Sequence, residues 1–307
     1  MTTESSSIVT MNHPQSSNGK PGSADPGVKT AHENGHFYSP IVDPRTLNAA
    51  QLWPAHPDII GVNFNDDSHE AILRDVFPRF MAEYDYPERL EETPDLKQFF
   101  TQNSQFSWLD SRALFVLLRE WRPRRLIEVG SGFSTLLAAD VNHRFLGDSI
   151  DITCVEPYPL PHLKRLAQQG DMTLIEHRVQ DVSLELFSSL EENGILFIDS
   201  SHVSKIGSDV NHEIFEILPK LRRGVFCHFH DIFFPWEFPK NWIEDHQLFW
   251  NEQYLVMAFL AYNDYFKIEI SNQFVALEMA KEYHTYFNRL TPAGTAGGAS
   301  LWIKVVK

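Results

Sequence analysis

Two segments of the sequence end apolar runs in residues that could bind a metal ion or move a proton. In ILFIDSSH the apolar run stops at Asp199, and His202 follows within the same segment. In VFCHFHD the run ends in His230 and Asp231. Carboxylates and imidazoles serve proteins both as metal ligands and as general acids or bases. These segments therefore mark a candidate site for metal-dependent or acid–base chemistry.

The two aspartates are expected to share one pocket. If the two apolar runs form neighbouring parallel strands, their ends lie about 4.8 Å apart at the edge where ligands bind. Two carboxylates so close repel each other unless a cation or proton joins them, so we expect a divalent metal held by Asp199, Asp231 and His230. Oxygen ligands favour Mg²⁺ or Mn²⁺, a histidine-rich set favours Fe, Zn or Ni, and the sequence permits both. Strand alternation places Asp231 and His230 on opposite faces unless the chain turns there, and His228 is interpreted as a core histidine.

A glycine-containing turn indicates a nucleotide-type ligand. The segment LIEVGSGFST places Gly130 and Gly132 between an apolar run and a helical pattern. Glycines let a ligand approach the backbone there, and a helix start presents free N–H groups. Thr135 stands where a dinucleotide-binding GxGxxG pattern needs its third glycine, which argues against NAD.

Two acids flank this turn. Glu128, near the end of the first apolar run, could meet an amino group, and Glu156, at the end of the second, could accept hydrogen bonds from both ribose hydroxyls. Either acid alone could be a solvated strand end. Together they favour a ligand with an amino acid part and a ribose.

The blocks EVGSGFST, VEPYP and RVQDV resemble those of class I S-adenosylmethionine-dependent methyltransferases, in particular the branch with an ExGSGxST motif. The resemblance covers about residues 106–307, and the closing GGASLWIK looks like the last strand of that fold. It implies that the first motif holds the methionine part, the acid after the second strand the ribose, and an acid after the third strand the adenine. The cofactor-binding residues predicted in this way are Glu128, Gly130, Ser131, Gly132, Ser134, Thr135, Glu156 and Asp181.

The resemblance also gives the chemistry of the two acidic strand ends. Small-molecule O-methyltransferases of this fold that use a metal place acids after the fourth and fifth strands, and Asp199 and Asp231 match these positions. We therefore predict transfer of the methyl group of S-adenosylmethionine to a hydroxyl of a sugar or natural product, with Mg²⁺ or Mn²⁺ as an optional second cofactor. The predicted catalytic residues are His230, His202 and Asp199, with one of the histidines taking the hydroxyl proton.

Two other functions are compatible with the same residues. The His and Asp cluster could serve a metal-dependent hydrolase or oxygenase, or the chain could be a non-catalytic module that binds S-adenosylmethionine. Three acids placed for the amino acid part, ribose and base favour methyl transfer over hydrolysis. Retained cofactor binding without turnover would indicate the binding module.

The elements that must position these residues alternate between strand and helix. Near-continuous apolar runs separated by helical patterns predict a parallel sheet covered on both faces. With the resemblance, this gives a Rossmann-like, doubly wound α/β fold of seven mostly parallel strands, the last one antiparallel. Strands are expected at 125–129, 151–158, 172–179, 194–202, 224–231, 265–271 and 300–306. Helices are expected at 107–121, 135–143, 161–169, 183–193, 209–221, 251–262 and 276–287.

The chain divides into three predicted parts. Residues 1–35 have almost no large apolar side chains and are expected to form a disordered tail. Residues 36–106 are expected to form an N-terminal helical extension that covers the site, with a helix at 69–84. Residues 107–307 are expected to form the S-adenosylmethionine-dependent methyltransferase domain. The aromatic segment 232–250 is either a lid over an apolar or sugar acceptor or a satellite cluster that holds the loop down.

Composition limits the partners. The 307 residues are 43% hydrophobic, and 41 acidic against 26 basic residues give a net charge of −15. No basic run is present, so we expect a small-molecule acceptor and no nucleic acid partner. The amino terminus lacks a secretory signal and no run is long enough to span a bilayer, so no membrane partner is expected. Cys154 and Cys227 are interpreted as buried thiols, which suits the cytoplasm. A homo-oligomer is left open.

Overall fold

The computed structural model describes residues 30–54, 57–93, 96–106, 108–279 and 298–307. The predicted tail at 1–35 falls outside these ranges except for its last residues, and so does most of the helix expected at 276–287. The three predicted parts of the chain stay a prediction. None of the helices in the described ranges is long and apolar enough to cross a membrane.

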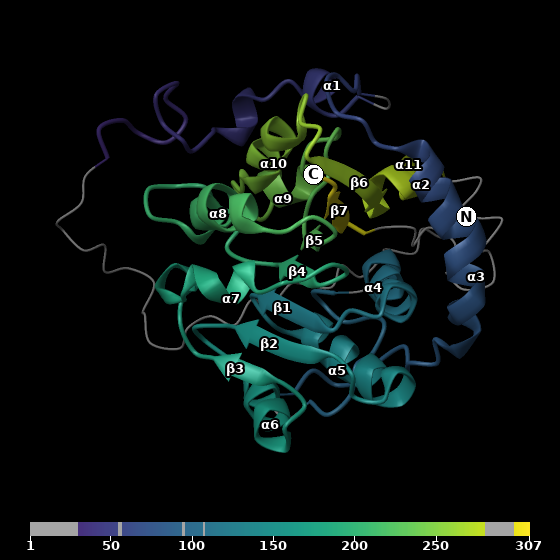
Figure 1. Cartoon of the computed structure of the whole chain (residues 1–307). Helices are drawn as coiled ribbons and strands as arrows, with labels where there is room; N and C mark the ends of the chain where they lie inside the picture. Colours follow the sequence, from purple (N-terminus) through teal and green to yellow (C-terminus); the bar gives the residue numbers. More distant parts are fainter. Residues whose placement is uncertain (1–29, 55–56, 94–95, 107, 280–297) are drawn as a thin grey trace, which may run out of the picture.

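A seven-stranded sheet forms the centre of the molecule, in the order β3-β2-β1-β4-β5-β7-β6 (Figure 1). Strands β1 to β5 run parallel, whereas β7 is antiparallel to both β5 and β6. The predicted doubly wound α/β fold with an antiparallel last strand is therefore confirmed. The strands are β1 (Arg125–Val129), β2 (Asp151–Val155), β3 (Thr173–Ile175), β4 (Ile195–Ile198), β5 (Phe226–Phe229), β6 (Phe266–Ser271) and β7 (Leu301–Val305).

Helices cover both faces of the sheet, which explains why its central strands are apolar along their whole length. Within β1, Leu126 packs into the core on one face and Ile127 into the core on the other. The first core is closed by α4 (Trp108–Trp121), α5 (Phe133–Leu146) and α6 (Pro161–Gln169). The second is closed by α7 (Leu184–Ser188), α8 (Asp209–His212), η5 (Glu213–Ile217) and α10 (Glu252–Leu260).

The segment before α4 consists of short helical pieces. These are η1 (Pro44–Thr46), α1 (Ala49–Leu52), α2 (Asp66–Ala71), η2 (Ile72–Val76), α3 (Phe77–Phe80) and η3 (Met81–Glu83). The amide of Asn65, just before α2, donates to the carbonyl of Ile268 in β6 at 2.7 Å, and α3 packs on α4. This part of the extension lies beside the sheet (Figure 1).

Two predicted helices are interrupted. The helix expected at 69–84 changes to π-type hydrogen bonding at η2 and restarts at α3, where Pro78 occupies the first turn. The helix expected at 209–221 changes in the same way at η5 and ends in η6 (Leu218–Lys220), which contains Pro219. Proline has no N–H and its ring clashes with the preceding turn, so the regular ladder cannot run through either position. The other short helices are η4 (Val179–Asp181), α9 (Lys240–Glu244) and α11 (Asn272–Leu277).

Candidate active site

A pocket of about 330 Å³ opens at the carboxyl ends of the central strands. Its lining residues are Ser104, Gln105, Phe106, Gly130, Ser131, Gly132, Phe133, Ser134, Glu156, Asp199, Ser200, Ser201, His202, His230, Asp231 and Trp250. A second pocket of about 360 Å³ adjoins it, because both are lined by Gly130, Glu156, Asp199, Ser200 and Ser201. The glycine turn and the acidic strand ends, separate in the sequence, therefore lie at one place.

The glycine turn packs directly against the end of β4. Gly130 has a φ of +75°, in the left-handed region, and its N–H donates to the carbonyl of Val155 at 3.0 Å. A Cβ at this position would lie 1.8 Å from the carbonyl oxygen of Asp199. No other amino acid fits, because its side chain would overlap the backbone of the neighbouring strand end. At Gly132, by contrast, the nearest atom to an added Cβ is Gln105 Oε1 at 3.5 Å, which is ordinary contact.

Glu128 holds the start of helix α5 and faces away from the pocket. Its carboxylate accepts hydrogen bonds from the Ser134 hydroxyl, from Thr135 Oγ1 at 2.6 Å and from Cys154 Sγ at 3.4 Å. The side chain is buried, and this burial raises its pKa to about 7 despite the three donors. Glu128 therefore supports the loop and lines neither of the two pockets, so its predicted contact with the methionine part stays a prediction.

Glu156 and Asp181 differ in their position. Glu156 lines both pockets and accepts hydrogen bonds from the backbone N–H groups of Ser131 at 3.3 Å and Tyr158 at 2.7 Å. Burial raises its pKa. Asp181 lies on η4, where its carboxylate pairs with Arg178 at 2.8 Å. On this side the second pocket is lined by 178–180, so the predicted contact between Asp181 and adenine stays a prediction.

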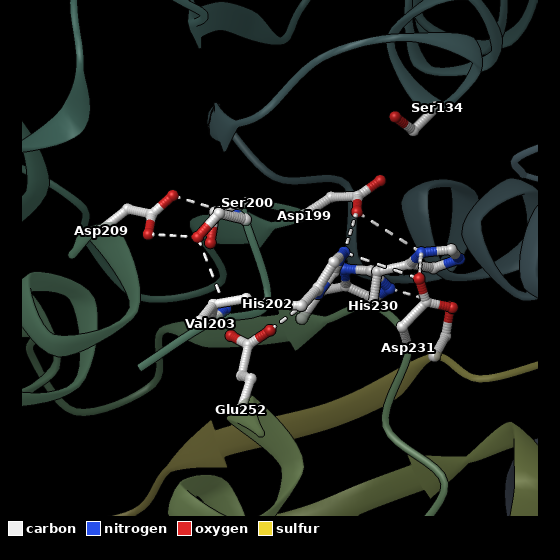
Figure 2. Close-up of polar contacts among 12 residues, drawn as sticks. Ser134, Asp199, Ser200, His202, Val203, Asp209, His230, Asp231 and Glu252 are labelled. Atoms are coloured by element: carbon white, nitrogen blue, oxygen red, sulfur yellow. Dashed lines mark hydrogen bonds and ion pairs between the residues drawn. The ribbon is translucent and has the colours of Figure 1, made fainter. Parts of the chain in front are cut away.

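Four side chains from the ends of β4 and β5 form a closed set of contacts, which we call the Asp–His quartet: Asp199, His202, His230 and Asp231 (Figure 2). His202 Nε2 lies 3.4 Å from Asp199 Oδ1 and 3.5 Å from Asp231 Oδ2. His230 Nδ1 lies 3.5 Å from each of the same two oxygens. Carboxylate oxygens and ring nitrogens thus alternate around a common centre.

Turns in the backbone make this convergence possible. Strand β5 ends at Phe229, and Asp231 has a φ of +56°, so the chain has already left the strand when it reaches the aspartate. This explains how His230 and Asp231 can face each other although strand alternation would separate them. His202 also has a positive φ, +59°. Such backbone is uncommon outside glycine and typically costs on the order of 1 kcal/mol, which the contacts of the quartet must offset.

Two further carboxylates contact the outer nitrogens of the quartet. Glu252, the first residue of α10, lies 2.8 Å from His202 Nδ1, and Asp110 of α4 lies 3.6 Å from His230 Nε2. Asp110 is fixed by the N–H groups of Ala299 at 3.1 Å and Ser300 at 2.9 Å. Sequence reasoning missed both acids. The signal for Asp110 was an acid within the apolar part of a helical pattern, whereas Glu252 had none.

The surrounding carboxylates set the charge state of the quartet. Burial disfavours protonation of His202 and His230, but the adjacent acids outweigh it and hold the pKa of both rings well above the usual value. Burial would raise the pKa of Asp199, yet the two imidazoles hold it well below its usual value. In the absence of another cation, the two rings therefore carry the positive charge that separates the two aspartates.

The quartet is consequently organised as ion pairs. No group of three or more His, Cys, Asp or Glu side chains in the described ranges is identifiable as a metal site by its present geometry. The metal predicted at Asp199, Asp231 and His230 thus stays a prediction.

His228 lies outside the quartet, in the core. It stacks on Phe197 with ring centroids 3.7 Å apart, and its Nε2 is 2.8 Å from Ser300 Oγ, as expected for a core histidine.

The aromatic segment after β5 forms the predicted satellite cluster and also contributes to the pocket, while its role as a lid over an acceptor stays a prediction. Phe233 and Phe238 are buried in a satellite cluster that Trp242 joins. The indole N–H of Trp53, from the N-terminal segment, donates to the carbonyl of Phe238 at 2.8 Å and ties the two segments together. Trp250 packs against this cluster and also lines the pocket, where its ring lies 4.4 Å from that of His202.

Comparisons with known proteins match the part of the chain that contains this site. Residues 127–232 match the model of a family described as a methyltransferase domain, and this range contains β1 to β5, the glycine turn and the whole quartet. The match shows that this part of the chain is a methyltransferase domain, and its sheet order is the one expected for the class I fold.

A relative in sequence matches a longer part of the chain. A protein of Archaeoglobus fulgidus, described as an uncharacterized protein, is 36% identical over 179 residues, which cover 56% of this chain and 80% of that protein. The chain belongs to the same family as this archaeal protein.

Solved structures show a weaker likeness. The O-methyltransferase TomG from Streptomyces achromogenes, involved in tomaymycin synthesis, is 14% identical, with a TM-score of 0.40 over 80% of this chain and 92% of that chain. The O-methyltransferase from Bacillus cereus is 15% identical, with a TM-score of 0.39 over 77% and 91%.

We expect Gly130→Ala to destabilise the protein by about 2–4 kcal/mol, because a Cβ would overlap the carbonyl of Asp199. Gly132→Ala is the matched control and should change the free energy of unfolding by less than about 1 kcal/mol. Urea unfolding followed by circular dichroism measures both. Equal stability of the two variants would contradict the packing described for Gly130.

Glu128 should make stability fall with rising pH. Its pKa is about 7 in the folded protein against 4.5 for the free side chain, so the folded state binds more protons between these values. From pH 5 to pH 7.5 the wild type should lose about 2–3 kcal/mol more than Glu128→Gln, which has no proton to release. Urea unfolding at the two pH values measures this, and exposed Glu176→Gln is the control. A parallel response of wild type and Glu128→Gln would contradict it.

Proposed function

We propose that the protein is an O-methyltransferase that moves the methyl group of S-adenosylmethionine to a hydroxyl of a small molecule, a sugar or natural product. The observation that carries the proposal is that Glu156, the candidate ribose acid, and the Asp–His quartet line the same pocket. A cofactor held by the first would bring its sulfonium to the second. We also place the chain in the ExGSGxST branch, which is supported by EVGSGFST at residues 128–135.

The cofactor would lie across the two adjoining pockets. Its methionine part would follow the backbone of the turn at 130–132, which the position of Gly130 against β4 leaves open to a ligand. Its ribose would meet the carboxylate of Glu156, and its base would enter the second pocket beside Val179 and Gln180. This arrangement uses the predicted residues of the glycine turn, with Ser134 and Thr135 acting through Glu128.

Methyl transfer needs little covalent chemistry from the protein. The acceptor oxygen attacks the methyl carbon, the sulfur–methyl bond breaks, and the hydroxyl proton leaves, giving S-adenosylhomocysteine and a methyl ether. The protein must align the acceptor and accept the proton. Asp199, His202 and His230 line the pocket in which the acceptor would react, and an imidazole there can take the hydroxyl proton only when it has lost its own proton and binds no metal.

The proposal includes a divalent cation held by Asp199, Asp231 and His230, for which Mg²⁺ or Mn²⁺ was the sequence-based expectation. When bound, such an ion would lower the pKa of the acceptor hydroxyl. The chain's own contribution is to hold the carboxylates at the required spacing and to exclude water from them. The side chain of Asp231 is only 13% exposed.

The acceptor would enter between Trp250 and Phe106, whose rings line the pocket beside the quartet. Flat apolar faces of this kind suit a sugar ring or an aromatic natural product. The net charge of −15 is consistent with a small-molecule partner rather than nucleic acid. Both cysteines are free and buried, which supports a cytoplasmic location as part of the proposal.

Glu156→Ala should weaken binding of S-adenosylhomocysteine at least tenfold, because a ribose whose hydroxyls lose a charged acceptor forfeits about 1.5–3 kcal/mol. Isothermal titration calorimetry of the full chain with S-adenosylmethionine and S-adenosylhomocysteine measures this. Glu176→Ala, an exposed acid that pairs with Lys164, is the matched control and should bind like wild type. Absence of binding to the wild type would contradict the proposed function, and equal affinity in Glu156→Ala would contradict the assigned ribose contact.

A further inference from the structure

The four contacts within the Asp–His quartet share an unusual length. All lie between 3.4 and 3.5 Å. A charge-assisted hydrogen bond between imidazole and carboxylate is normally about 2.7–2.9 Å long, as the contact of His202 with Glu252 at 2.8 Å shows in this chain. The quartet is therefore not held by direct hydrogen bonds of normal strength. Each ring nitrogen instead lies at nearly equal distance from two carboxylate oxygens.

The outer nitrogens of both rings are turned toward other acids. His202 Nδ1 contacts Glu252, so when a metal replaces one ring proton the ring keeps the other proton at Nδ1 and presents the lone pair of Nε2 to the space between Asp199 and Asp231. His230 directs Nε2 toward Asp110 and Nδ1 toward the same two aspartates. A lone pair directed at carboxylates is unfavourable unless a positive charge lies between them. Carboxylate–imidazole pairs in this order are the usual support of metal-binding histidines.

We propose that the Asp–His quartet is a site for one divalent transition metal, with Asp199, His202, His230 and Asp231 as its four protein ligands. Four donors spaced 3.4–3.5 Å from their neighbours leave a centre about 2.1 Å from each if tetrahedral and about 2.4 Å if square. Transition metals such as Zn²⁺ bind these atoms at about 2.0–2.2 Å, so only a small adjustment is needed.

The donor set determines the class of metal. Two of the four donors are imidazole nitrogens, which suit Fe²⁺, Zn²⁺, Co²⁺ or Ni²⁺, whereas Mg²⁺ takes oxygen ligands in near-octahedral geometry. The site therefore differs from the Mg²⁺ or Mn²⁺ site expected from the sequence, and His202 becomes a ligand. Glu252 and Asp110 are positioning residues, because they contact the rings and not the pocket.

The site is closed except toward the pocket. The side chains of His202 and His230 are 8% and 7% exposed, and Trp250 covers one ring while Phe106 covers the other. Asp199 is the most accessible ligand, with its side chain 28% exposed. A metal here would border the space assigned to the acceptor hydroxyl. The inference rests on the proposed function only for this use of the metal, since binding itself can be measured without turnover.

The experiment is titration of the full chain, stripped of metal with EDTA and dialysed, with Co²⁺. Cobalt replaces other divalent transition metals, and its visible absorption reports nitrogen ligands and low coordination number. We expect one equivalent to bind with a visible spectrum, Zn²⁺ to displace it, and millimolar Mg²⁺ to leave it in place. Binding of S-adenosylhomocysteine, measured on the same samples, reports separately on the cofactor site.

Variants test the assigned ligands. Asp231→Asn should weaken Co²⁺ binding at least a hundredfold, and Glu252→Gln should weaken it about 10- to 100-fold through the orientation of His202. His143→Asn, at an exposed histidine that contacts Asp148, is the control and should bind like wild type. Retained S-adenosylhomocysteine binding shows that a variant is folded. If Asp231→Asn fails this check, His202→Asn takes its place.

The outcomes separate the two claims. A wild type that binds S-adenosylhomocysteine but neither Co²⁺ nor Zn²⁺ would overturn the metal site and leave the proposed function standing. Binding of Mg²⁺ in preference to Co²⁺ would overturn the transition-metal assignment. Co²⁺ binding that survives in Asp231→Asn would place the metal elsewhere and overturn the quartet as its site. Binding of Co²⁺ without any binding of the cofactor would count against the proposed function alone.

Discussion

The contact between Gly130 and the backbone of Asp199 is the constraint on which the rest of the site depends. It brings the end of β1 against the end of β4 so closely that a single carbon atom on residue 130 could not be accommodated. The turn that would bind the cofactor and the carboxylate that would serve the reaction are therefore parts of one packed unit. Their spacing is set by the sheet and not by mobile side chains.

Buried charge is the second constraint, and the chain stabilises its buried carboxylates in two ways. Glu128 is stabilised by neutral hydroxyl donors and partly by keeping its proton, as its raised pKa indicates. Asp199 and Asp231 are stabilised by cations, in this structure two imidazole rings. Burying an unpaired carboxylate costs several kcal/mol, so the quartet can lose its ring protons only if another positive charge replaces them. The stability of the strand ends and the chemistry of the site are thus coupled.

Sequence reasoning predicted the sheet well because its strands are buried on both faces and are apolar along their length. It also brought Asp199, His230 and Asp231 to one edge, since the carboxyl ends of parallel strands meet there. It assigned His202 a proton-transfer role, which stays a prediction, and the structure places His202 Nε2 beside both Asp199 and Asp231. The positive φ of Asp231, which lets the aspartate face His230, cannot be read from residue types, because aspartate adopts such backbone only in particular contexts.

The two outer acids of the quartet could not be predicted, because they lie far along the chain from the histidines that they contact. Glu252 contacts His202 from α10, 50 residues along the chain. Asp110 contacts His230 from α4, which covers the other face of the sheet from α10, so no local sequence pattern joins either pair. The proposed function requires that the cofactor and the quartet share one pocket. The most direct measurement is a crystal structure of the protein with bound S-adenosylhomocysteine. We expect the ribose on Glu156 and the sulfur facing the quartet. A cofactor bound elsewhere, or with its sulfur directed away from Asp199, would overturn the proposed function.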